Sequence, residues 1–226
     1  MTVLDASVTI SKVVYYPQTL DNPFIIKVVE HPTSRLSCAS CVSPIDAKPQ
    51  TMSAYLPNGF PEPAEIGAIE VKQYPQYRAV TYTHAGDVRQ ATGVAFNPLF
   101  EHISNNQIAM TTPVEARYTA IPGQIDVAPQ VEVSFLYPAP NIAPSSVNSA
   151  VTVTDTPPMT VVSIGIQGAY TWESYEKNLQ KLEDWLKEHP EYAIVGPPRR
   201  LFYNSPMTPE AIKISEVQIP IDISNK

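Results

Sequence analysis

Apolar and polar residues after position 65 follow an order that occurs twice. The first unit has four strand-like stretches, with a helix-like spacing of apolar residues after the second: residues 69–74, 77–84, 108–120 and 130–137. The second unit repeats the order, with its helix-like spacing again after the second stretch: residues 151–154, 159–167, 192–195, 199–203 and 212–221. Because each unit leaves one apolar sheet face uncovered, the two should pack together. The pattern predicts an α+β fold of duplicated β-β-α-β-β units.

One helix is predicted in each unit. In the second, Thr171 can cap the helix, Glu173 suits its first turn and Pro190 ends it. Its apolar stripe consists of Trp172, Tyr175, Leu179, Leu182 and Trp185. In the first unit, Pro98 interrupts the helical spacing, so we expect a kink or two short helices there.

The first 64 residues differ from the rest in composition. Residues 8–16 and 24–29 are rich in β-branched residues, as strands are. Residues 32–63 contain six prolines, which favour an extended backbone and block sheet hydrogen bonds. We predict a proline-rich N-terminal extension over residues 1–64, with no identifiable protein partner, and a domain over residues 65–226.

Composition and charge narrow the class of protein. The 24 prolines in 226 residues exclude a helical bundle, because proline removes a backbone donor within a helix. A net charge of −7 argues against nucleic acid as a partner, because phosphate binding needs a cationic surface. The sequence has no run of 18 apolar residues and no N-terminal secretory signal. We therefore expect an intracellular, cytoplasmic protein.

The two cysteines, Cys38 and Cys41, form a C-x-x-C pair. Val42 follows the pair in place of histidine, which excludes covalent attachment of c-type haem. A structural role, a disulfide or redox role, and half of a zinc site with His31 are all compatible with this spacing. The sequence leaves these three roles open.

The sequence lacks the common catalytic motifs. The sequence contains no nucleophile elbow, phosphate loop, metal-binding helix or dinucleotide fingerprint. We therefore predict no catalytic residues and no metal site, and the sequence favours a binding protein over an enzyme.

Glu216 is the carboxylate with the most unusual surroundings. Strict alternation places it on one strand face with Ile212, Ile214 and Gln218. A carboxylate among apolar neighbours is costly unless it is paired. We expect either a ligand-binding role or a structural pair with Arg199, Arg200 or a backbone donor.

Two neighbouring segments carry a family resemblance. Residues 93–103 read Gly-Val-Ala-Phe-Asn-Pro-Leu-Phe-Glu-His-Ile, and residues 108–114 read Ile-Ala-Met-Thr-Thr-Pro-Val. This arrangement resembles the SOUL haem-binding family, in which an aromatic-rich helix end leads into a strand reading roughly Ile-x-Met-Thr-x-Pro-Val. Residues 162–168, Pro197 and residues 215–220 agree with the family in the same order. The resemblance covers about residues 66–222.

The resemblance implies a distorted antiparallel β-barrel flanked by two helices. It also implies a relation to the gyrase inhibitor-like and multidrug-effector-binding domains, which share this duplicated architecture. In the SOUL family, a tetrapyrrole lies in an apolar groove beside the first helix. Carried onto this sequence, the groove candidates are Val88, Ala95, Phe96, Leu99, Phe100, Ile103 and Met110. His102 is either an iron ligand or a half-exposed histidine at the helix end.

Four functions are therefore considered, the last of which is a protein-interaction role for the proline-rich first 64 residues. The first is binding of haem or another tetrapyrrole, with weak or absent axial ligation of the iron. The second is a sensor or sequestering domain for amphipathic cations, because in the effector-binding relatives a glutamate matching Glu216 meets cationic, aromatic ligands. The third is an enzyme acting on a hydrophobic small molecule, with Glu216 as acid or base.

Overall fold

A computed structural model of the protein describes residues 55–118 and 130–223. These residues belong to one structural unit of the chain, Lys48–Lys226. The predicted strands in residues 8–16 and 24–29, and the pair Cys38 and Cys41, lie outside the described residues. The predicted domain boundary at residue 64 also stays a prediction.

The helices and strands follow the predicted order. The first unit consists of β1 (Ile69–Tyr74), β2 (Tyr77–Ala85), α1 (Ala91–Asn105), β3 (Val114–Tyr118) and β4 (Gln130–Leu136). The second consists of β5 (Thr152–Thr156), β6 (Met159–Gln167), α2 (Trp172–Glu188), β7 (Tyr192–Ile194), β8 (Arg199–Phe202) and β9 (Ile214–Ile223), with a 3-10 turn at Glu210–Ile212. The main difference is at residues 108–120, where the strand begins only after Pro113, which has no N–H to donate to a neighbouring strand.

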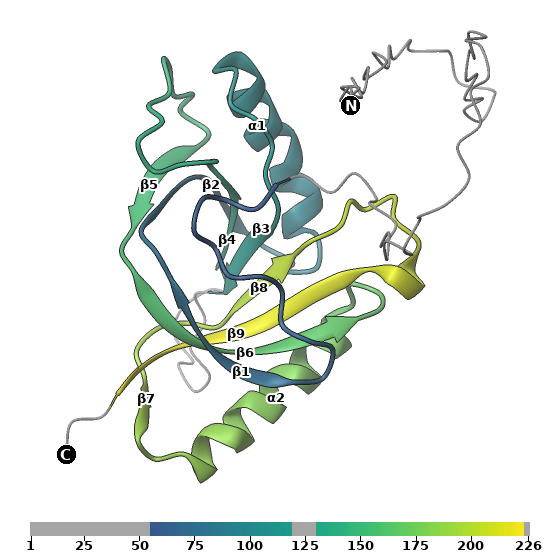
Figure 1. The fold of residues 1–226 in the computed structure, drawn as a ribbon. Helices are drawn as coiled ribbons and strands as arrows, with labels where there is room; N and C mark the ends of the chain where they lie inside the picture. Colours follow the sequence, from purple (N-terminus) through teal and green to yellow (C-terminus); the bar gives the residue numbers. More distant parts are fainter. Residues whose placement is uncertain (1–54, 119–129, 224–226) are drawn as a thin grey trace, which may run out of the picture. The chain divides into compact units, whose positions relative to one another are not determined.

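The strands form one antiparallel sheet with the order β1-β6-β9-β8-β3-β4-β2-β5, and β7 pairs with β9. Exchanging the two units reverses this order, so the sheet has an approximate two-fold relation with β3 and β8 together at its centre. β1 pairs with β6, and β5 pairs with β2, so the first strand of each unit pairs with the second strand of the other unit. The sheet curls into a half-barrel accompanied by two helices (Figure 1), which confirms the predicted α+β fold.

Both helices pack on one face of the sheet, as their apolar stripes predict. α2 begins after Thr171, whose Oγ1 accepts a hydrogen bond of 3.1 Å from the Ser174 N–H. α1 is one continuous helix with Pro98 inside it, so the two short helices suggested by Pro98 do not form. Burial of its inner side offsets the hydrogen bond that Pro98 cannot donate, through Ala91, Ala95, Leu99, His102 and Ile103.

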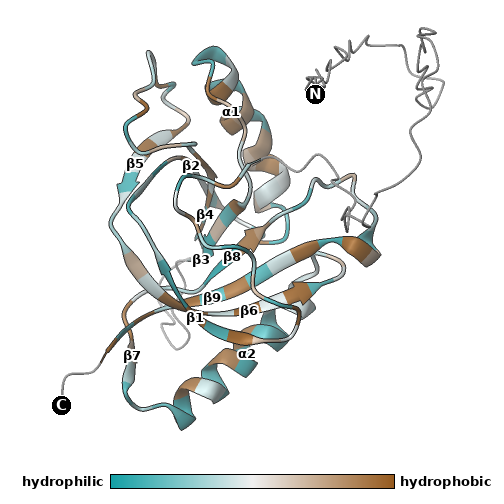
Figure 2. Cartoon of the chain, viewed as in Figure 1, coloured by the Kyte–Doolittle hydropathy of each residue, from teal (hydrophilic) through white to brown (hydrophobic). Residues whose placement is uncertain are grey.

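Helix α2 has hydrophobic residues on one side and hydrophilic residues on the other (Figure 2). On α2, hydrophilic residues alternate with hydrophobic ones at helical spacing, and the buried residues are Tyr175, Asn178, Leu182 and Leu186. Within residues 55–118 and 130–223, no helix is long and apolar enough to cross a membrane.

The face of the sheet opposite the helices is covered by residues 55–66, which we call the N-terminal strap. The Phe60 ring meets the rings of Tyr74 and Tyr77 edge-on, at centroid distances of 5.0 and 5.3 Å. Phe60 and Leu56 pack against a buried cluster formed by Tyr74, Val161, Leu201 and Tyr203. The strap therefore closes the sheet face that the helices leave uncovered.

The end of the strap lies so close to β6 that only glycine fits at Gly165. A Cβ at this position would lie 2.4 Å from the Glu65 carbonyl oxygen and 2.5 Å from that of Ala64. We predict that Gly165→Ala lowers the free energy of unfolding by about 1–3 kcal/mol, because the strap must shift. Urea denaturation measures this change.

Gly93→Ala in α1 is the matched control, because a Cβ there meets nothing within 4 Å. This variant should raise the free energy of unfolding by about 0.5–1 kcal/mol, since alanine favours the helix over glycine. Equal tolerance of both substitutions would contradict the close approach of the strap.

Candidate functional site

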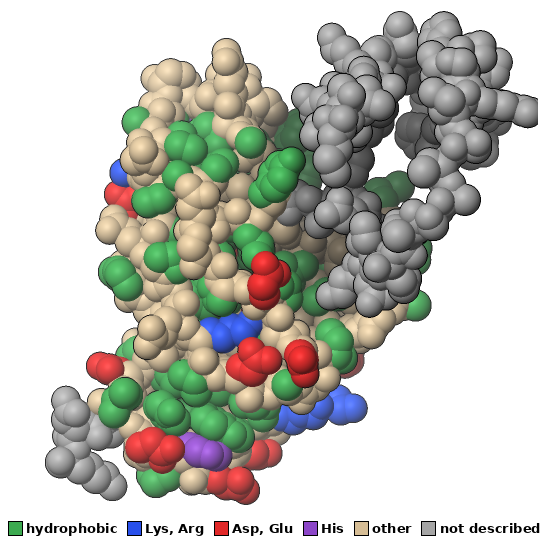
Figure 3. Space-filling view, in the orientation of Figure 1, with side chains coloured by type: hydrophobic (Ala, Val, Ile, Leu, Met, Phe, Trp, Pro, Cys, Tyr) green, Lys and Arg blue, Asp and Glu red, His purple; other side chains and the backbone are tan. Residues whose placement is uncertain are grey.

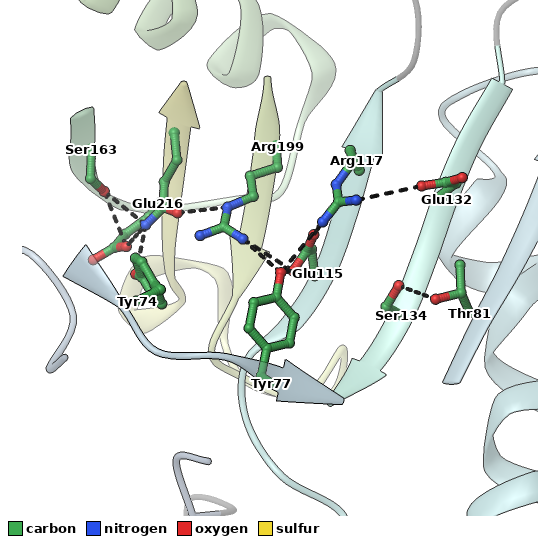
Figure 4. A network of polar contacts seen from close by, with 11 residues as sticks. Tyr74, Tyr77, Thr81, Glu115, Arg117, Glu132, Ser134, Ser163, Arg199 and Glu216 are labelled. Atoms are coloured by element: carbon green, nitrogen blue, oxygen red, sulfur yellow. Dashed lines mark hydrogen bonds and ion pairs between the residues drawn. The ribbon is translucent and has the colours of Figure 1, made fainter. Parts of the chain in front are cut away.

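Ionisable side chains lie at the centre of the strap-covered face (Figure 4). Glu115 on β3 accepts hydrogen bonds from the Tyr77 hydroxyl at 2.8 Å, from Arg117 at 2.7 Å and from Arg199 on β8 at 3.3 Å. Arg117 also lies 3.9 Å from the carboxylate of Glu132 on β4. Glu115 and Arg199 are both buried, so each charge depends on the other for compensation. The network joins strands from both units.

The network sets the protonation states of its members. Burial alone would raise the pKa of Glu115, but the charges of Arg199 and Arg117 outweigh it and hold this pKa below its usual value of 4.5. Burial, helped by the charge of Glu115, raises the pKa of Tyr77 to about 12. At neutral pH, Glu115 is therefore an ionised acceptor and Tyr77 a protonated donor.

Glu216 on β9 is fully buried on the same face. Its carboxylate accepts hydrogen bonds from Lys72 Nζ at 2.7 Å, from Gln218 at 2.6 Å and from Ser163 at 3.1 Å. The Ala64 N–H of the strap donates a further hydrogen bond to it. The carboxylate is thus supplied with donors by the chain itself.

Lys72 neutralises Glu216 and also fixes the strap, because its Nζ donates to the Glu62 carbonyl at 2.7 Å. The backbone donor expected for Glu216 is present, whereas Arg199 and Arg200 donate to other groups. A ligand cation would have to replace Lys72 beneath the strap. The geometry therefore gives no support to the cation-binding alternative or to an acid–base role for Glu216, and both stay untested predictions.

The predicted groove residues divide between two surfaces. Three of them are buried in the core between α1 and the sheet: Ala95, Leu99 and Ile103. Val88 and Met110 are partly buried against the same core. Phe96 and Phe100, by contrast, are 40% and 48% exposed. Of the predicted set, only these two phenylalanines share an accessible apolar surface, and Glu216 lies on the opposite side of the sheet.

Phe96 and Phe100, which we call the aromatic pair, stack on each other on α1. Their rings are nearly parallel, at an interplanar angle of 10° and a centroid distance of 5.6 Å. Phe96 also meets the ring of Phe135 on β4 edge-on at 5.6 Å. Because Phe135 is buried, this contact fixes the pair relative to the sheet.

His102 lies on the buried side of α1 and is only 3% exposed. Its Nε2 lies 2.7 Å from the Tyr137 hydroxyl, and its Nδ1 is buried without a hydrogen-bond partner. Burial lowers the pKa of His102, so the ring is neutral at pH 7. The expected half-exposed histidine is thus buried, because the helix turns it toward β4 and the segment that follows it. Its role as an iron ligand stays a prediction that this geometry does not support.

A small cavity adjoins His102 at the end of α1. Its volume is about 30 Å³, and its lining is mostly polar, including Glu101, Asn106 and Asn148. This is space for roughly one water molecule. The cavity is therefore too small to admit a macrocycle to His102.

The described side chains favour apolar contact over proton transfer or metal chemistry. Glu115 and Glu216 are buried and already paired with cations of the chain. In the part of the chain that the structure describes, no three His, Cys, Asp or Glu residues gather to hold a metal ion.

The sequence did not predict Glu115 or Lys72 as members of a site, and it did not predict that Arg199 would pair with Glu115. Alternation along β1 places Lys72 and Tyr74 on one face, which was the available signal. It did not suffice, because the partner strand of β1 is β6, which comes from the other unit.

Removing the charge of Glu216 alone should strongly destabilise the protein. Glu216→Gln leaves Lys72 buried without a countercharge, so we expect the free energy of unfolding to fall by about 3–5 kcal/mol. The double variant Glu216→Gln/Lys72→Met removes both charges and should recover at least half of the loss. Urea denaturation of the wild type, Glu216→Gln, Lys72→Met and the double variant measures the coupling, and simple additivity would contradict the pairing.

Acid should weaken the Glu115 network. Because the folded-state pKa of Glu115 is lowered, its ionised form contributes stability above about pH 4.5, and this is lost as the pH falls through the folded-state pKa. The difference in free energy of unfolding between the wild type and Glu115→Gln should therefore be largest at neutral pH and shrink in acid. Urea titrations at stepwise lower pH measure it, and a constant difference would exclude the ionised pair.

Several solved structures share this fold. The C-terminal domain of EcmrR has 14% sequence identity and a TM-score of 0.59, over 71% of this chain and 100% of that one. An uncharacterized conserved protein from Listeria innocua has 12% identity and a TM-score of 0.54, over 70% and 94%. EcmrR in a complex with DNA has 14% identity and a TM-score of 0.59, over 70% of this chain but only 59% of that one. These identities show the fold alone, so the expected absence of a nucleic-acid partner stays a prediction.

The family assignment comes from the sequence. A comparison with curated proteins finds no match. The sequence model described as SOUL heme-binding protein matches residues 62–220, which include both units of the sheet and both helices. The chain therefore belongs to the SOUL heme-binding protein family.

Proposed function

We propose that this protein binds haem or a related tetrapyrrole by apolar contact with the aromatic pair, Phe96 and Phe100. Membership of the SOUL family supports a tetrapyrrole as the ligand. The observation that carries the placement is the exposure of these two stacked rings on α1, where the other groove candidates are buried.

The exposed rings suit the apolar part of such a ligand. A buried aromatic side chain removes roughly 150–250 Å² from water, and Phe96 and Phe100 are still 40% and 48% exposed. Covering both would contribute about 4 kcal/mol at ~25 cal/mol per Å², before the cost of association. Aromatic rings pack against one another in offset-stacked or edge-on arrangements, and both are open to a conjugated macrocycle.

The described part of the chain offers few partners near the aromatic pair for the propionates and the iron of haem. Arg89, exposed just before α1, is the nearest basic residue in sequence for a propionate. His102 does not fit as an iron ligand while its Nε2 is bonded to Tyr137. The residues thus fit a macrocycle held by apolar burial, without axial ligation by His102. Bound haem would supply redox-active iron, and the chain would supply the apolar surface.

Haemin titration followed by the Soret band tests this placement. Phe96→Ala/Phe100→Ala should weaken haemin binding more than tenfold, because the variant removes both exposed rings. Val94→Ala is the matched control, since Val94 is 44% exposed on α1 but points about 200° away from Phe96 around the helix. It should change the affinity by less than twofold.

His102→Gln tests the absence of ligation. Glutamine can still bond to Tyr137, so the Soret maximum and the affinity should match those of the wild type. A spectral change confined to this variant would show that His102 binds the iron. A wild-type protein with no saturable Soret change at micromolar concentration would overturn the proposed function.

A further inference from the structure

A cleft of about 420 Å³ lies beside α2, away from the aromatic pair. It is bounded by the end of the strap, the end of β6 and the first half of α2, and we call it the α2 cleft. Among its lining residues, we call Ile66, Gly165 and Ile166 the floor, and we call Lys177, Asn178 and Lys181 the rim. The volume falls within the range of about 300–1,000 Å³ found for small-molecule sites.

The cationic rim has no anionic partner. Lys177 and Lys181 lie one helical turn apart, and neither is within 4.0 Å of a carboxylate among the described residues. Lys181 Nζ lies 3.2 Å from the neutral Asn178 Oδ1, and the buried Asn178 is fixed by its bond to the Ser174 carbonyl at 2.7 Å. Glu173 also lines the cleft, which leaves an excess of one positive charge there. Figure 3 shows Lys or Arg side chains projecting beside α2.

The floor of the cleft includes an exposed apolar side chain, Ile66. Ile66 is 51% exposed although its backbone is bridged to Gly165. Gly67 has a φ of 80° and nothing within 4 Å of the place where a Cβ would lie. An apolar surface thus lies directly beside two ammonium groups.

We propose that the α2 cleft binds an amphipathic carboxylate, with its apolar body on Ile66 and Ile166 and its carboxylate between Lys177 and Lys181. Charge complementarity selects the ligand: two unpaired lysines on a chain of net charge −7 form a local cationic site. The apolar floor requires a ligand with a hydrocarbon or aromatic body. This site is separate from the tetrapyrrole surface on α1.

Dodecanoate, below its micelle-forming concentration, is the probe. Titration of the full-length protein followed by calorimetry and amide NMR shifts should show one saturable site, with shifts centred on the α2 cleft. Lys177→Gln/Lys181→Gln should weaken binding at least fivefold. Lys187→Gln is the matched control, because Lys187 lies on the same helix outside the cleft and is paired with Asp184. It should leave the affinity unchanged.

Two further measurements separate the site from general hydrophobic binding. Ile66→Ser should weaken dodecanoate binding without altering the charge of the rim. Dodecyltrimethylammonium should bind at least tenfold more weakly than dodecanoate. Equal binding of the two amphiphiles, no saturable binding of dodecanoate, or equal losses in the Lys187 and Lys177/Lys181 variants would each overturn the proposal.

Haemin titration of the same variants separates this site from the proposed function. Lys177→Gln/Lys181→Gln should leave the Soret titration unchanged, because the aromatic pair lies on the other helix. Loss of haemin binding in this variant would make the α2 cleft part of the tetrapyrrole site and overturn the separate carboxylate site.

Discussion

The buried contact between Glu115 and Arg199 lies where the two units of the sheet meet, and the rest of the structure depends on it. β3 and β8 pair with Glu115 opposite Leu201 and Arg117 opposite Arg199, so the two charges reach each other diagonally across the central seam. A shift of one residue would turn these charges toward the helices, where Ala116 belongs to the apolar core. Burying either charge there without its partner would cost several kcal/mol. The network thus opposes a shift of one residue in the register between the units.

The same polar face explains where ligands have access. The strap covers this face, and on it the Ala64 N–H and Lys72 Nζ both donate hydrogen bonds to the Glu216 carboxylate. Glu216 therefore works as an anchor for the strap. The two surfaces that we propose as binding sites lie instead on the helices, which carry different chemistry: stacked rings on α1 and unpaired lysines on α2. Duplication supplied two similar helix positions, and the exposed residues at these positions differ in chemistry.

The candidate site depended on information that local pattern does not contain. The family resemblance indicated Phe96 and Phe100 together with Ala95, Leu99 and Ile103, but it did not show which of them the sheet would cover. The pattern also left the exposure of His102 open, although burial against Tyr137 decides whether its ring nitrogen is free. The α2 cleft joins Ile66, Gly165 and Lys181, which lie more than 100 residues apart in sequence at their extremes.

The sequence by itself determined the elements, the duplication and the family, because these depend on short-range periodicity and on contiguous motifs. The cap at Thr171, the strands around the two turns and the Met-Thr-Thr-Pro-Val segment all belong to this class. The tertiary structure alone decided the partners of Glu115 and Glu216, because β1 and β5 cross to the opposite unit and the strap returns over the sheet. Which countercharge a buried charge meets depends on which strands lie side by side. Strand alternation specifies the face on which a residue lies, but it does not specify the residues on the adjacent strands.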